Sequence, residues 1–143
     1  MPTLESTRIV NRRQILPNMT NNLGTVHGGV IMHMMDATGA LSAMRFAGKR
    51  VVTAHVDDID FIHPIPGGDI ARVDSYVYEA GRSSISVRIR VYGEDPLSGD
   101  GELTSASRFT YVALDDDRRP TEVPSLEVES DEARRLRTEA LED

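Results

Sequence analysis

The chain has 143 residues, of which 39% are hydrophobic and 27% charged, so it is long enough for one compact domain and too short for two of ordinary size. Its formal net charge of −7 disfavours a nucleic-acid partner, because phosphate binding relies on clustered Lys and Arg. It contains no cysteine, which excludes disulfides, thiol catalysis and thiolate metal sites. The first residues, MPTLESTRIVNRRQ, lack the apolar segment of a secretion signal, so we expect a cytoplasmic protein.

The first long element that the sequence predicts is a helix over residues 28 to 47, which follows a short extended arm (4 to 16) broken at Pro17. Apolar residues recur in this helix at helical spacing. The stripe expected to enter the core comprises Val30, Met34, Ala37, Leu41 and Met44, widened by Ile31, Met35, Ala43 and Phe46. A helix that is apolar nearly all round is buried on most sides. His33 and Asp36 interrupt it, so a membrane span is not expected.

Asp36 is the unusual residue of this helix, because a carboxylate lies among hydrocarbon side chains. One interpretation is that it occupies an exposed stripe or pairs with a neighbour. The other is that burial tunes Asp36 as a base that works near neutral pH.

Beyond the helix, the hydrophobic period changes from helical to alternating, which predicts four strands in hairpin succession. The first covers residues 51 to 61, and a slip in its alternation predicts a bulge at Asp57–Asp58. The other strands are predicted over residues 70 to 80, 84 to 92 and 103 to 115. The expected fold class is therefore α+β, with one long central helix wrapped by a curved antiparallel sheet.

The sequence becomes polar and rich in proline after Asp115, so the domain is expected to cover residues 1 to 118. Residues 119 to 143 form a polar C-terminal tail. A short docked helix over 130 to 141, capped by Ser130, and a frayed end are both open for this tail.

The start of the long helix carries features of a site. Gly28 and Gly29 allow a ligand to approach the backbone closely, and the first-turn N–H groups have no intrahelical acceptors. Such donors suit a carbonyl oxygen that gains negative charge. Asp36 lies eight residues further on, a rise of about 12 Å. One chain's Asp36 and Gly28 therefore cannot reach the same bond, and the sequence predicts a site at a dimer interface.

The ordered segments NNLGTVHGG, Asp36, VVTAHVDDIDFIHPI, GGD, GRSS and FTYVALD resemble the hot-dog-fold acyl-CoA thioesterases, over about residues 18 to 115. The likeness is greatest to the acyl-CoA hydrolase branch of that superfamily. It implies the hydrolysis of an acyl-CoA thioester to a free carboxylic acid and coenzyme A. It also implies a homo-oligomer. The smallest assembly expected is a dimer, and dimers are expected to assemble into a tetramer or a hexamer.

The resemblance also implies residue roles. Asp36 is the general base or nucleophile, and the backbone N–H of Gly28 polarises the thioester carbonyl in a loop that His27 shapes. Asn21 positions water or the thioester, and Thr53 orients water or Asp36. Thr25 stands where some relatives carry a catalytic Asp or Asn, which leaves Asp36 as the main candidate.

The resemblance places the turn that contains Arg82, Ser83 and Ser84 near the coenzyme A phosphates, and Arg suits phosphate recognition. An ordinary hairpin is the alternative for this turn. Gly29 is also assigned to the coenzyme A part of the substrate. No metal and no separate cofactor are expected, since coenzyme A belongs to the substrate. His33, His55 and His63 are interpreted as packing or structural residues.

Two other functions remain open at this point. A hot-dog hydratase or dehydratase would use a His–Asp or His–Glu pair in other motifs, which this sequence does not contain. A non-enzymatic acyl-CoA-binding module would keep the start of the helix, but it would not need a costly carboxylate inside that helix.

Overall fold

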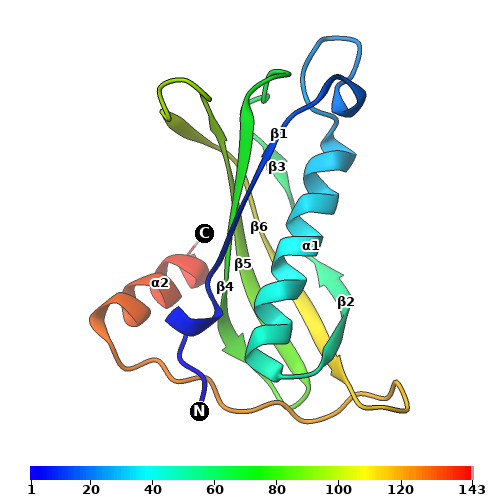
Figure 1. Cartoon of the computed structure of the whole chain (residues 1–143). Helices are drawn as coiled ribbons and strands as arrows, with labels where there is room; N and C mark the ends of the chain where they lie inside the picture. The colour runs from blue at the N-terminus through cyan, green and yellow to red at the C-terminus, as the bar shows by residue number, and fades with distance from the viewer. Residues whose placement is uncertain (143) are drawn as a thin grey trace.

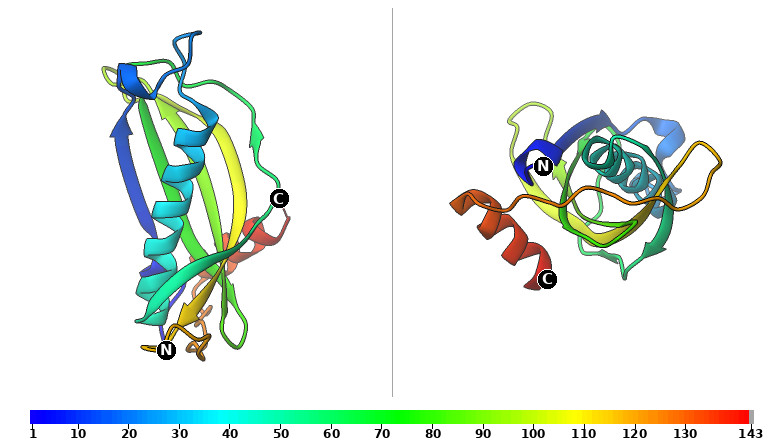
Figure 2. Two further views of the ribbon diagram at one scale, coloured as in Figure 1. Left: turned by 90° about the vertical axis from the view of Figure 1, so that its right-hand side faces the viewer. Right: turned by 90° about the horizontal axis from the view of Figure 1, so that it is seen from below.

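The fold is a curled antiparallel sheet that wraps around one long helix (Figures 1 and 2). The structure, a computed structural model, describes residues 1–142. The long helix, α1, spans Gly28–Ala47 as predicted. The strands of the sheet lie in the order β1 (Ile9–Gln14), β4 (Ile70–Ala80), β5 (Ser84–Glu94), β6 (Gly101–Leu114) and β2 (Arg50–Val56), and the short β3 (Asp60–Phe61) pairs with β6. This arrangement confirms the expected fold class.

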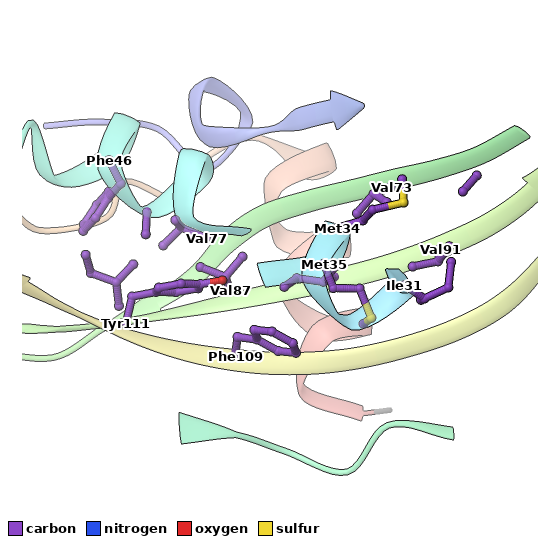
Figure 3. Close-up of a cluster of buried hydrophobic side chains, with 14 of the residues drawn as sticks. Ile31, Met34, Met35, Phe46, Val73, Val77, Val87, Val91, Phe109 and Tyr111 are labelled. Atoms are coloured by element: carbon purple, nitrogen blue, oxygen red, sulfur yellow. The ribbon is translucent and has the colours of Figure 1, made fainter. Parts of the chain in front are cut away.

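The core fills the space between α1 and the concave face of the sheet (Figure 3). The helix contributes Ile31, Met34, Met35, Thr38, Gly39, Ser42, Ala43 and Phe46 to the buried set. Two residues that the sequence analysis placed in the core stripe, Ala37 and Leu41, are exposed in the chain, Leu41 to 47%. That part of the prediction was wrong because the sheet covers only one side of an apolar helix.

Strand β2 forms one edge of the sheet and is mostly exposed. Its register against β6 shifts between Thr53 and His55, and the chain leaves the strand after Val56. The bulge predicted at Asp57–Asp58 is therefore misplaced. The slip in the sequence pattern marks the gap between β2 and β3. Within this gap the Asp57 N–H still donates to the Arg108 carbonyl (3.0 Å).

The second helix, α2 (Asp131–Glu142), lies against the outer face of the sheet, on the other side from α1 (Figures 1 and 2). The Ser130 hydroxyl accepts the Ala133 N–H (3.0 Å), as an N-cap does. The buried cluster beneath the helix comprises Leu4, Tyr76, Tyr78, Ala133, Leu136 and Ala140. Within residues 1–142, no helix is long and apolar enough to cross a membrane.

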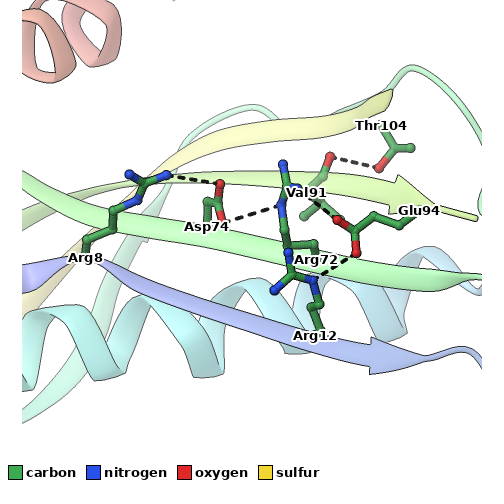
Figure 4. A network of polar contacts seen from close by, with 7 residues as sticks. All are labelled: Arg8, Arg12, Arg72, Asp74, Val91, Glu94 and Thr104. Carbon is green, nitrogen blue, oxygen red and sulfur yellow. Dashed lines mark hydrogen bonds and ion pairs between the residues drawn. The ribbon is translucent and has the colours of Figure 1, made fainter. Parts of the chain in front are cut away.

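Charged side chains join β1, β4 and β5 on this outer face (Figure 4). Arg12 Nε donates to Glu94 Oε1 (3.0 Å), and Arg72 Nη1 donates to Glu94 Oε2 (2.8 Å). Glu94 is only 6% exposed, so both of its oxygens are held by guanidinium groups in place of water.

Candidate active site

The carboxylate of Asp36 is held by side chains from two strands. The Thr53 hydroxyl, on β2, donates to Asp36 Oδ1 over 2.6 Å. The Tyr111 hydroxyl, on β6, donates to the Asp36 backbone carbonyl (2.9 Å) and lies 3.2 Å from Oδ1. Asp36 is half-buried in the single chain, which lies between the exposed and the buried positions that the sequence left open. The reason is the same one-sided cover of α1 by the sheet.

Tyr111 is the residue of this group that the sequence analysis did not single out. It is fully buried, and burial raises the pKa of its hydroxyl, with a further contribution from the Asp36 charge. The only sequence signal was a tyrosine, with its polar hydroxyl, at a core-facing position of the FTYVALD strand. That signal does not reveal which residue the hydroxyl contacts.

The start of α1 forms a second cluster. His27 is the N-cap residue, and its carbonyl accepts the N–H groups of Val30 (3.1 Å) and Ile31 (3.3 Å). In the part of the chain that the structure describes, the Gly28 and Gly29 N–H groups have no acceptor. They are therefore free to bind a carbonyl oxygen.

A pocket of about 260 Å³ opens beside this helix start. The Phe61 ring closes one side of it, since a Cβ on Gly28 would lie 3.5 Å from the ring. Its lining is largely apolar and comprises Val26, Gly28, Ile31, Phe61, His63, Pro64, Ile65, Thr104 and Ser105. A hydrocarbon chain could therefore be bound next to the free N–H groups.

Asn21 organises the loop that leads into α1. Its Oδ1 accepts the N–H groups of Leu23 (2.9 Å) and Thr25 (3.2 Å), and the Thr25 hydroxyl lies 3.3 Å away. The side-chain oxygen is thus used within the loop, which leaves the amide nitrogen as the group that could contact water or substrate.

These residues form two separate groups within one chain. Thr53 joins Asp36, which is one of the two roles expected for it, whereas Asn21, His27, Gly28 and Gly29 gather at the start of the helix. The two groups are about 12 Å apart along the α1 axis, given a rise of about 1.5 Å per residue. A single chain does not bring them together.

The turn predicted to bind coenzyme A lies beyond the other end of α1. Arg82 is exposed and pairs with Glu122 (3.5 Å), and the Lys49 ammonium donates to the Glu122 carbonyl (3.0 Å). Both basic residues line one open pocket, together with Ser83. Ser84 begins β5 and accepts the Gly81 N–H with its carbonyl.

The histidines do not assemble a metal site. His55 pairs with Asp57 (2.9 Å), His63 lines the pocket beside Gly28, and His33 is exposed on α1. Within residues 1–142, no three His, Asp or Glu side chains are grouped so as to hold a metal ion.

Comparison with known proteins gives a consistent result. The sequence profile described as the Thioesterase superfamily matches residues 23–99. An uncharacterized acyl-CoA thioester hydrolase of Bacillus subtilis, YkhA, is 34% identical over 138 residues, which cover 96% of this chain and 80% of that protein. The fold is also similar to that of an apo-hexameric acyl-CoA thioesterase (TM-score 0.89, 36% identity), over 99% of this chain and 92% of that one.

An acyl-CoA hydrolase from Staphylococcus aureus, solved with butyryl coenzyme A and coenzyme A, has a TM-score of 0.89 and 34% identity, over 97% of this chain and 85% of that one. Alanine variants of that enzyme were solved at an asparagine, an aspartate and a threonine, separated by 15 and 17 residues. In this chain the separations are the same, 15 from Asn21 to Asp36 and 17 from Asp36 to Thr53. The resemblance seen in the sequence is confirmed: the chain belongs to the thioesterase superfamily.

Proposed function

We propose that this protein hydrolyses acyl-CoA thioesters to a free carboxylic acid and coenzyme A. The observation that carries the proposal is the Asp36 carboxylate, which Thr53 and Tyr111 hold on the uncovered side of α1. The relatives named acyl-CoA thioester hydrolase and acyl-CoA hydrolase support the choice of substrate.

The reaction needs a base and an oxyanion site at the same carbonyl carbon. Asp36 takes a proton from a water molecule, and the water oxygen attacks the thioester carbon. The Gly28 N–H binds the oxyanion that forms. When the C–S bond breaks, the thiolate leaves and is protonated to coenzyme A, and Asp36 returns its proton to solvent. A direct attack by Asp36, through an anhydride that water then hydrolyses, gives the same products.

A second copy of the chain supplies the missing half of each site in this proposal. Two α1 helices that run antiparallel about a two-fold axis would bring Asp36 of each subunit to Gly28 of the other. The uncovered apolar side chains on α1 and β2 support such an interface; they include Met32, Leu41, Val52 and Val56. The relative described as hexameric is consistent with dimers that assemble further.

Coenzyme A would extend from this site toward basic residues. Gly29 lies at the helix start, and Arg82, Ser83 and Ser84 lie at the turn between β4 and β5. The protein would act without a cofactor, because the reaction needs only water, a base and hydrogen-bond donors. A cytoplasmic location is part of the same proposal.

The test measures thiol release from a panel of acyl-CoAs by wild-type protein and by Asp36→Asn and Asp36→Ala variants. We expect turnover in the wild type and a loss of at least ~10²-fold in kcat for both variants, the usual contribution of a positioned acid–base group. Asp116→Ala, a change of an exposed aspartate in the loop after β6, serves as the control.

Other outcomes identify other functions. A hydrated or dehydrated acyl group with no thiol release would indicate a hydratase or dehydratase. Binding of acyl-CoA with no turnover would indicate a binding module. An Asp36→Ala variant within a few-fold of the wild type, with an unchanged oligomeric state, would contradict the role of Asp36.

A further inference from the structure

The buried hydroxyl of Tyr111 bonds to the backbone and approaches the side chain of one residue, Asp36. The phenol O–H donates to the Asp36 carbonyl over 2.9 Å and lies 3.2 Å from Oδ1. Tyr111 is completely buried on the core side of β6. A buried hydroxyl needs a hydrogen-bond partner, but any nearby backbone carbonyl could serve as one. That need alone therefore does not explain why the Tyr111 hydroxyl lies at Asp36.

A glycine in the middle of α1 makes this contact possible. A Cβ at Gly39 would lie 2.6 Å from the Tyr111 hydroxyl and 2.6 Å from Ile89 Cδ1. Real Cβ atoms do not approach so closely, so a side chain at residue 39 would displace the phenol. Glycine inside a helix costs about 1 kcal/mol relative to alanine, which indicates a specific packing reason for it here.

The two oxygens of the Asp36 carboxylate have different surroundings. Thr53 donates to Oδ1 from β2, and Tyr111 approaches the same oxygen from β6. No hydrogen bond to Oδ2 occurs within residues 1–142. One oxygen is therefore anchored by protein donors, and the other remains available to a water molecule.

We infer that Tyr111 is a positioning residue, which fixes the Asp36 carboxylate so that Oδ2 is the oxygen that accepts the proton of the attacking water. The inference rests on the proposed function and concerns the same site. Tyr111 touches neither water nor thioester; it acts through Asp36.

The protonation of Tyr111 is consistent with this role. Burial and the Asp36 charge both raise the pKa of the phenol, so it stays a donor over the working pH range. The other groups near Asp36 are the Thr53 hydroxyl on β2 and the imidazole of His33, one turn earlier and exposed on α1. Thr53 and His33 are both exposed, whereas Tyr111 is buried, so water cannot take the place of its hydroxyl.

The test compares Tyr111→Phe with Tyr76→Phe. Tyr76 is equally buried, and its hydroxyl donates to the Leu136 carbonyl (2.7 Å) on the other face of the sheet. Each change removes one buried O–H···O=C bond, so their effects on stability should be similar. For Tyr111→Phe we expect kcat to fall by about 10-fold with KM nearly unchanged, the size of one hydrogen bond to a charged group.

The comparison of kcat with stability separates a positioning role from a structural one. If Tyr111 only stabilises the fold, Tyr111→Phe and Tyr76→Phe should lower the free energy of unfolding by similar amounts and leave kcat unchanged. If Tyr111 positions Asp36, only Tyr111→Phe should lower kcat, while KM stays nearly unchanged in both variants. If Tyr111→Phe behaves like Tyr76→Phe in both kcat and stability, the inference is wrong.

A further variant covers the case in which Tyr111→Phe does not fold. Gly39→Ala keeps the phenol but displaces its hydroxyl, so it should give a similar loss in kcat with KM nearly unchanged; a wild-type kcat would overturn the inference. In an Asp36→Asn background, Tyr111→Phe should have no further effect on kcat. An active Asp36→Asn variant would instead contradict the role of Asp36 as the base, and an absence of thiol release by the wild type would contradict the proposed function, which keeps these failures distinct.

Discussion

Asp36 is tolerated on an apolar helix because hydroxyl donors replace part of its hydration. Thr53 and Tyr111 bring those donors from two different strands, and the missing side chain of Gly39 admits one of them. The carboxylate is thus oriented without being sealed from solvent. This combination suits a group that must meet both water and a substrate.

Arg82 allows a test of coenzyme A binding at the scale of one residue. The chain carries a net charge of −7, so a polyanionic substrate needs local cations, and Arg82 is an exposed one. We expect Arg82→Ala to raise KM for acyl-CoA by about 10-fold and to leave kcat nearly unchanged. A truncated thioester that lacks the nucleotide should show no change in KM.

Arg137→Ala is the matched control for this measurement, because it removes an exposed arginine of α2 and alters the net charge equally. It should leave KM for both substrates unchanged. An equal rise in KM for the full and the truncated substrate would show that Arg82 does not bind the nucleotide phosphates.

At the scale of elements, the outer face of the sheet is held by charge and by α2, whereas the inner face is held by hydrocarbon. Arg12 and Arg72 fix Glu94 across β1, β4 and β5. Hydrogen bonding from Arg12 is the largest cause that lowers the pKa of Glu94. A carboxyl group with a lowered pKa stabilises the fold at neutral pH and loses that contribution as the pH falls.

Glu94→Gln tests this network through stability. At pH 7 the free energy of unfolding of the variant should be about 1–3 kcal/mol lower than that of the wild type, since two charged hydrogen bonds lose their acceptor charge. This difference between the two proteins should become smaller as the pH falls below the ordinary carboxyl pKa (about 4.3). Urea unfolding at pH 7 and at pH 3 to 4 measures both. A difference that stays constant with pH would contradict the assignment.

The whole molecule, as a single chain, has one uncovered side and, in the proposed mechanism, two half-sites. The Asp36 group and the Gly28 group are about 12 Å apart on one rigid helix, and no loop movement shortens that distance. An apolar strip on α1 and the unpaired edge of β2 lie on the same uncovered side. Both features are expected of a subunit that functions only with a second copy.

Mixing two inactive variants tests this arrangement. Asp36→Ala removes the base, and Gly28→Pro removes the N–H that binds the oxyanion. Proline is favoured at the first position of a helix, and His27 already has the extended conformation that a following proline requires. After subunit exchange, a mixed dimer has one intact site, so part of the wild-type activity should return.

Subunit exchange must be shown independently, for example by energy transfer between labelled chains. Exchange without any recovery of activity would mean that each site lies within one chain. Two copies of the same variant provide the baseline, because neither homodimer contains an intact site.

The sequence by itself determined the central helix to the residue, the alternation of the long strands and the set of segments that identify the family. These features depend on local chemistry: apolar period, the glycine at residue 48 with its positive φ of 65°, and turn residues. The resemblance left Thr53 to orient either water or Asp36, and the structure contains the contact with Asp36.

Only the tertiary structure decided which side of the helix is covered, where β2 leaves the sheet and which hydroxyl reaches Asp36. Ala37 and Leu41 have the same apolar character as their buried neighbours, so the pattern could not reveal that the sheet stops short of them. Tyr111 is 75 residues away from Asp36 in the chain. A contact across that separation is fixed by strand register and by the space at Gly39, which local sequence does not encode.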